Sequence, residues 1–163
     1  MNNREQIESE IRILREKIAL KQELIKKESF NKFENDLNKF VKLIEGKCIS
    51  LNNDGTDVFI KVKTAKVSNS SFNSGSCCIT LSSNKDIIYH YNGNNFNMQG
   101  KNYYIWITID QMNDFLYGRN IRIIDDNVFD NIHSEVTSTI KSIKNNIENI
   151  SRIKKISLED LKD

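Results

Sequence analysis

Apolar side chains recur every three or four positions in the last quarter of the chain, which predicts a long amphipathic helix from Asp126 to about Ile156. Asp125 and Asp126 suit the start of this helix, because acidic side chains are favourable at the positive end of a helix dipole. The residues of its apolar seam are Ile132, Val136, Ile140, Ile143, Ile147 and Ile150.

The same spacing over residues 3–45 predicts a second long helix with two apolar stripes. One stripe runs from Ile7 to Ile25 and the other from Phe30 to Ile44, with a change of phase between them. The segment is therefore either one helix whose buried face rotates or two helices that are broken near Ser29. Gly46 suits the left-handed residue that ends a helix.

Between residues 48 and 124 the hydrophobic period changes to two, which predicts about six short strands. Asn53-Asp54-Gly55 and Asn92-Gly93 are typical hairpin turns, and the polar segment 68–76 is expected to be a loop. Residues 102–110 form the longest β run. This run is apolar on both faces, which indicates a strand covered on both sides.

The pattern predicts an α+β protein: a small antiparallel β-sheet or barrel flanked by long N- and C-terminal amphipathic helices. Residues 1–46 form the N-terminal helical arm, 47–125 the antiparallel β domain, and 126–163 the C-terminal helix and tail. The seam of the C-terminal helix must pack against the N-terminal helix, the sheet or another copy of the chain, since an isolated helix is unstable in water. We favour pairing of the two helices together with self-association.

Composition limits the function classes without selecting one. Charged residues make up 28% of the 163-residue chain, the net charge is +2, and no segment concentrates basic residues as nucleic-acid binders usually do. There is no apolar signal segment and no membrane-length apolar span, so we expect a cytoplasmic protein, in the host cytoplasm if it is phage-encoded. The three cysteines, Cys48, Cys77 and Cys78, are an odd number without metal-binding spacing, which indicates reduced thiols.

No catalytic, cofactor or metal-binding motif occurs in the sequence. His90 and His133 stand alone, and we interpret His90 as a strand residue at the surface or in a satisfied contact and His133 as a solvated helix residue. We therefore expect a protein that is not an enzyme and that needs no cofactor.

Aromatic residues cluster in the central strands and form the candidate binding surface. Tyr104 and Trp106 share one face of the 102–110 strand, which is either a second core under a helix, the interpretation we favour, or an exposed recognition surface. Nearby basic residues suit a single-stranded nucleic-acid platform, and Tyr, Trp and Arg also anchor protein interfaces. The candidate residues are Tyr89, Tyr91, Phe96, Tyr104, Trp106, Lys61, Lys63, Arg119 and Arg122.

The Asn-, Ile- and Lys-rich composition, the charged N-terminal helix and the run from Phe40 to Cys48 that leads into a strand resemble small accessory proteins of phages, including anti-CRISPR proteins. The resemblance implies a non-enzymatic inhibitor that blocks a host defence nuclease or effector sterically. Our leading hypothesis is accordingly a protein-binding module, with the helices available for homo-oligomer formation. The alternatives are a single-stranded nucleic-acid-binding β-barrel and a small-ligand-binding protein.

Overall fold

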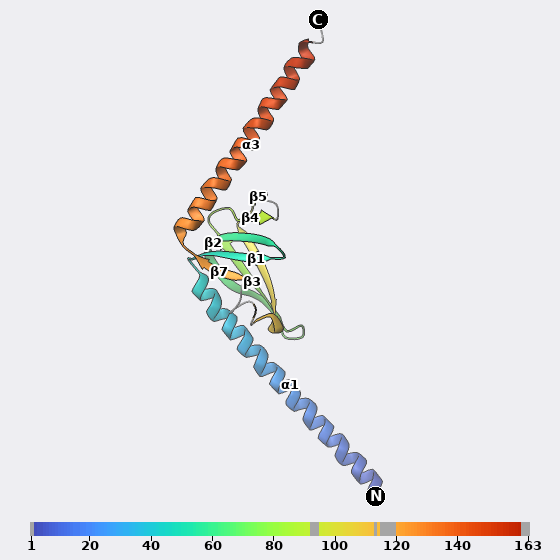
Figure 1. Cartoon of the computed structure of the whole chain (residues 1–163). Helices are drawn as coiled ribbons and strands as arrows, with labels where there is room; N and C mark the ends of the chain where they lie inside the picture. Colours follow the sequence, from blue (N-terminus) through green and yellow to red (C-terminus); the bar gives the residue numbers. More distant parts are fainter. Residues whose placement is uncertain (1, 92–94, 113, 115–119, 161–163) are drawn as a thin grey trace.

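A β domain lies in the middle of the molecule and a long helix leaves it at each end (Figure 1). The computed structural model describes residues 2–91, 95–112, 114 and 120–160, with side chains described as far as residue 152. The architecture is α+β, as the sequence predicts.

Helix α1 (Asn3–Ile44) is continuous, so the expected alternative of a break near Ser29 does not occur. At its start the backbone N–H of Asn2 donates to the Glu5 carboxylate at 3.2 Å. At its end Gly46 adopts φ +76°, in the left-handed region predicted for it. The N–H of Gly46 then donates to the Val62 carbonyl at 3.0 Å, which leads the chain directly into the sheet.

Seven antiparallel strands form one open, bent sheet. Along β2 (Thr56–Ser71), the first half pairs with β1 and β4 and the second half with β3, which in turn pairs with β6. The other strands are β1 (Cys48–Asn53), β3 (Ser76–Ser83), β4 (Ile88–Tyr91), β5 (Asn95–Met98), β6 (Asn102–Thr108) and β7 (Ile121–Ile124), with a 3₁₀ turn η1 (Ile109–Gln111) after β6.

Two predicted turns and one predicted loop can be compared with this sheet. The β1–β2 hairpin turns at Asp54 (φ 47°) and Gly55 (φ 82°), as predicted. The loop expected over residues 68–76 is shorter than predicted: β2 continues to Ser71 and β3 begins at Ser76, which leaves residues 72–75 as the turn. Polar residues extend the strands here because their backbones pair with each other while Asn69 and Ser70 face solvent. The Asn92-Gly93 turn lies outside the described residues, although β4 and β5 pair antiparallel on either side of it.

The two helices cover opposite faces of the sheet. The second half of α1 buries Phe33, Leu37 and Ile44 against the inner face, which carries Ile49, Ile60 and Ile79. Helix α3 (Asp126–Asp160) buries Phe129 and Val136 against the outer face, which carries Cys48 and Ile88. Covering both faces creates two small cores, each built around one helix half.

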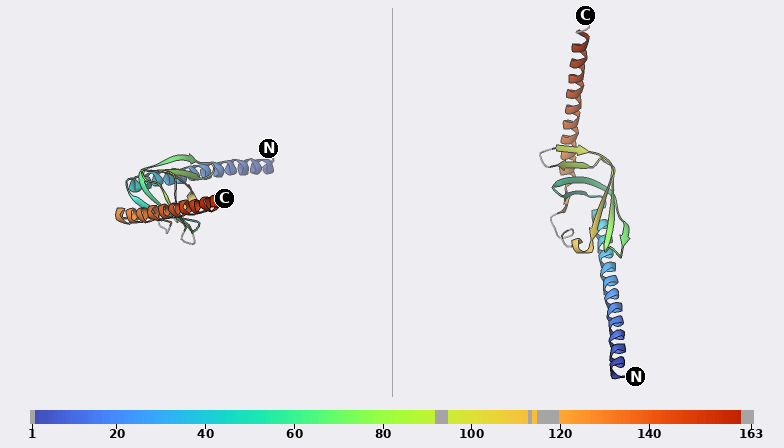
Figure 2. Two further views of the ribbon diagram at one scale, coloured as in Figure 1. Left: turned by 90° about the horizontal axis from the view of Figure 1, so that it is seen from above. Right: turned by 90° about the vertical axis from the view of Figure 1, so that its right-hand side faces the viewer.

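Pairing of the two helices within one chain, one of the arrangements expected from the sequence, is not what the structure shows. The first half of α1 and the second half of α3 diverge from the β domain at a wide angle, so the two termini lie far apart, at the bottom and the top of Figure 1 and of the right-hand view of Figure 2. The α3 seam is consequently covered in part: Val136 is buried and Ile132 and Ile140 are half-buried, whereas Ile143, Ile147 and Ile150 are 53–58% exposed.

Candidate interaction surface

The strand predicted to be covered on both faces, β6, is instead covered on one. Tyr103, Ile105 and Ile107 point to the inner core, while Tyr104 and Trp106 on the other face are 61% and 60% exposed. The preference for a second core under a helix was therefore wrong. Helix α3 contacts the outer face at β2 and β5, and in the described part of the chain it does not extend over the part that β3 and β6 form.

Strand β6 is also an edge strand in the described part of the chain, because it pairs only with β3. The Ser83 N–H donates to the Lys101 carbonyl at 2.8 Å, and the Ile109 N–H donates to the Gly75 carbonyl at 2.9 Å. Hydrogen-bonded pairs alternate along an antiparallel ladder, so the odd-numbered residues between them bond to β3. The backbone N–H and C=O groups of Tyr104 and Trp106 consequently face the unpaired edge.

A hollow of ≈ 710 Å³ follows this edge of β6. The β1–β2 turn forms its other wall, with Leu51 and Asn52 to Asp54. Gln111, Asp114 and Asn120 complete a lining that is aromatic, amide-rich and acidic. This composition favours a partner that brings backbone amides or a positive charge rather than a phosphate.

The basic residues predicted for the same surface are not gathered around Tyr104 and Trp106. The Lys61 ammonium lies 3.7 Å from the Asp126 carboxylate at the start of α3. Lys63 is exposed in β2, at a register shift against β3, and Arg122 is exposed on β7 at the other side of the sheet. Arg119 lies outside the described residues. Lys66, which was not among the predicted residues, lies in register with Thr80 and hence in the same row as Tyr104.

The remaining predicted aromatic residues divide between the two sheet faces. Tyr89 stacks on Tyr91 with 6.4 Å between ring centroids and lies 6.3 Å from Tyr103, and burial raises the pKa of the Tyr89 phenol. Phe96 stacks on His90 at 4.3 Å on the opposite face. These residues hold the β4–β5 hairpin together, and Tyr91 and Phe96 are 38% and 39% exposed.

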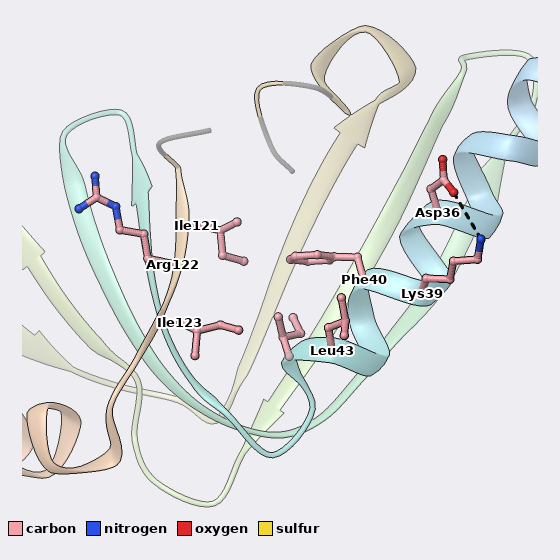
Figure 3. A pocket seen from close by; sticks show the side chains of 8 residues that line it. Asp36, Lys39, Phe40, Leu43, Ile121, Arg122 and Ile123 are labelled. Atoms are coloured by element: carbon pink, nitrogen blue, oxygen red, sulfur yellow. Dashed lines mark ion pairs between the residues drawn. The ribbon is translucent and has the colours of Figure 1, made fainter. Parts of the chain in front are cut away.

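A second hollow, of ≈ 530 Å³, lies between α1 and β7 and was not predicted (Figure 3). Phe40 and Leu43 face Ile121 and Ile123 across it, and the Asp36–Lys39 ion pair at 3.9 Å lies on its rim (Figure 3). Leu43 and Ile123 are 68% and 60% exposed. The sequence signal was the position of Leu43 beside, rather than within, the second stripe of α1.

In the described ranges, the histidine and cysteine side chains lie apart from one another or are buried. His90 Nδ1 lies 3.8 Å from an Asp57 carboxylate oxygen, and His133 is half-buried against the Phe129 ring, which corrects its interpretation as solvated. All three cysteines are free and buried. Among the residues that the structure describes, no group of three or more His, Cys, Asp or Glu side chains is arranged to hold a metal ion.

Comparison with known proteins gave no match: no family model, curated protein or solved structure is significantly similar to this chain. Among the described residues, no helix combines the length and apolar character required to cross a lipid bilayer.

Proposed function

We propose that this chain is a non-enzymatic protein-binding module whose docking surface is the outer face and free edge of β6. The single observation that carries the proposal is the exposure of Tyr104 and Trp106, at 61% and 60%, side by side on an edge strand. Large aromatic side chains contribute disproportionately to binding energy at protein interfaces, because each buries a large area with little loss of rotamer freedom.

The partner that fits this surface is a protein segment in extended conformation. Such a segment adds to a sheet by accepting and donating hydrogen bonds along an unpaired edge, while pockets beside the edge select its side chains. The Tyr104 and Trp106 backbones supply the edge, and Asp54 and Asp114 on the wall of the hollow favour basic residues in the segment.

A narrower form of the proposal follows from the resemblance to phage accessory and anti-CRISPR proteins. In that form the partner is a host defence nuclease or effector, and the bound module blocks its substrate sterically. Adding the purified protein to the effector should then stop cleavage in proportion to complex formation, and the Trp106→Ser variant should inhibit less. If a complex forms and cleavage is unaltered, the steric-blockade role is contradicted, but the protein-binding role is not.

Single-stranded nucleic acid is the second candidate, since the exposed rings of Tyr104 and Trp106 suit base stacking and Lys66 lies in the same row as Tyr104. We favour the protein partner because Lys61 is already ion-paired with Asp126 and the hollow beside β6 is acidic. Binding of an oligonucleotide that weakens steeply with salt would reverse this preference.

Trp106 is the only tryptophan of the chain, so its fluorescence reports directly on this surface. The full chain is immobilised and used to capture protein from a lysate of the cells in which it acts, in parallel with the Tyr104→Ser/Trp106→Ser variant. We expect the wild-type chain to capture one protein in a stoichiometric amount and the double variant to capture much less of it. Titrating that purified protein should shift the Trp106 emission to the blue as the ring leaves water.

Tyr91→Ser is the matched control, because Tyr91 is another exposed tyrosine that lies on β4, away from the proposed edge. It should retain the captured protein. Equal capture by the wild type and the double variant, with equal thermal unfolding, would contradict the proposed surface.

A further inference from the structure

The α1 arm, which we define as Asn3–Glu28, carries an apolar ridge that none of the described residues of its own chain covers. Helix α1 buries side chains only from Phe30 onward. The ridge residues before that point are 43–63% exposed, and they are Ile7, Ile11, Leu14, Ile18 and Ile25. Contiguous exposed apolar surface of this extent is typical of an interaction site.

The β domain cannot cover this ridge by a small movement of the arm, because the ridge faces another direction. Leu37, at the centre of the packed half, follows Ile25 by 12 residues. At 3.6 residues per turn, this separation is three full turns plus about 120°. The arm also projects past the edge of the β domain in both views of Figure 2. Its ridge is therefore open to a second helix along its whole length.

The ridge has the heptad spacing of a short two-stranded coiled coil. With Ile11, Ile18 and Ile25 at the a positions, Ile7 and Leu14 occupy d positions. β-Branched residues at a with Leu at d favour two parallel strands, and Leu14 at the central d position between Ile11 and Ile18 fits that rule. Lys21 occupies the next d position, where a single charged residue costs stability and restricts register and partner number.

Flanking charges distinguish the two helix orientations. In a parallel pair, Glu10 at a g position faces Arg15 at the following e position of the second helix, and the contact occurs on both sides. In an antiparallel pair with the same apolar layers, Arg15 would face Arg15 and Lys17 would face Lys17 across the two-fold axis. Charge complementarity therefore favours the parallel pair.

We propose that the α1 arms of two copies of this chain form a parallel coiled coil, which places both β domains at the same end of the rod. This inference goes beyond the proposed function and uses a different surface, so each can fail without the other. A parallel dimer would present two β6 surfaces together, which raises the effective affinity for a partner that carries two matching segments.

The first test is the mass of the full chain in solution by light scattering and sedimentation at 1–100 µM, a range of about two decades in concentration. We expect two copies. Ile18→Glu should raise the dissociation constant by roughly 100-fold or more, because it places two carboxylates in one apolar layer. Leu20→Glu is the matched control: Leu20 is 62% exposed, against 55% for Ile18, but lies at a c position outside the seam.

Cross-linking decides the orientation. Because the three native cysteines are buried, Leu14→Cys adds one exposed thiol, and it should oxidise to a disulfide-linked dimer of identical chains. A monomer or a trimer at 100 µM would overturn the proposal, as would a greater loss with Leu20→Glu than with Ile18→Glu. Cross-linking that occurs only when Leu14→Cys is mixed with Ile18→Cys would also overturn it, because it indicates antiparallel helices. The Tyr104→Ser/Trp106→Ser variant should remain a dimer.

Discussion

The two long helices leave the β domain in different ways. In α1 the apolar face turns by about 120° between the packed half and the arm. In α3 it does not turn: Ile143 follows the buried Val136 by seven residues, about two turns, and lies almost directly beyond it on the same face. One helix thus presents a separate surface, and the other extends the surface that it already uses.

The exposed apolar side chains of the two helices therefore have different structural causes. The α1 arm cannot extend the inner core, so its ridge requires an independent partner to be covered. The α3 overhang, which we define as residues 141–152, continues the line of Phe129 and Val136 past the edge of the sheet. A partner that docks on the β domain beside α3 would cover it without any new orientation of the helix.

The two helices also differ in the polar contacts that attach them to the β domain. The first turns of α3 make three polar contacts with the β domain. The Asp126 carboxylate accepts a hydrogen bond from the Cys48 thiol at 3.2 Å and forms an ion pair with Lys61 at 3.7 Å. The Asp130 carboxylate accepts a hydrogen bond from the Lys85 ammonium at 2.9 Å. Helix α1 has a long contact from the Ser70 hydroxyl to the Glu34 carboxylate at 3.5 Å. Polar contacts therefore help fix the direction in which α3 leaves the sheet, whereas α1 is held mainly by packing.

The largest expected effect compares two positions on one line of α3. Val136→Asp buries an unpaired charge at a 2% exposed site and should destabilise the chain by about 3–5 kcal/mol. Ile143→Asp, at a 53% exposed site, should cost less than about 1 kcal/mol, mostly through helix propensity. Urea unfolding measures both. Equal losses would mean that the overhang is covered in solution, most simply by another copy.

The second effect compares the two cores through their thiols. Cys48 lies under α3, and its pKa is raised from 9.0 to about 11, mainly by burial and secondly by its hydrogen bond to Asp126. Cys77 lies under α1, and its pKa is raised to about 11, mainly by burial and secondly by the negative charge of Glu34. The unfolded thiols lose their protons first. The resulting stabilisation is therefore complete below pH 9 and is lost as the pH rises through 11.

We expect each thiol to account for about 2 kcal/mol of that loss between pH 8 and pH 11. The free energies of unfolding of the wild type, Cys48→Ala and Cys77→Ala at pH 8 and pH 11 isolate the contribution of each thiol. The lysines and tyrosines also titrate in this range, but they are the same in all three proteins. Asp126→Asn should reduce the contribution of Cys48 and leave that of Cys77 unchanged. Equal pH dependence in the wild type and both alanine variants would contradict the prediction.

The smallest effect tests the Lys85–Asp130 contact. The hydrogen bond from Lys85 lowers the pKa of the Asp130 carboxyl, so this contact stabilises the fold above the ordinary pKa of an aspartate and is lost as the pH falls through the lowered value. Lys85→Gln should lower the melting temperature slightly at pH 7 and not at all once Asp130 is protonated. Glu34→Gln in α1 is the control and should have no measurable effect. A loss with Lys85→Gln that persists in acid would assign the effect to packing.

Local patterns were sufficient for the element types. Spacings of three and four residues predicted both helices, and Asp54-Gly55 predicted the first hairpin because few residues tolerate positive φ. The candidate surface was predicted only in part. The strand period predicts Tyr104 and Trp106 as a pair on one face, but that face is exposed and not covered as expected. Lys61, expected beside them, is ion-paired with Asp126 instead.

The sequence by itself determined the type and order of most elements, although not every boundary, because hydrophobic period and turn chemistry act over a few neighbouring residues. Tertiary structure decided which apolar faces are covered, because burial depends on how far each element extends past its neighbours. Strand β6 is apolar on both faces yet has a helix on one, and α3 has one uniform seam yet leaves the sheet halfway along it. Periodicity determines which face of an element an apolar side chain points to, and only the tertiary structure determines whether another element covers that face.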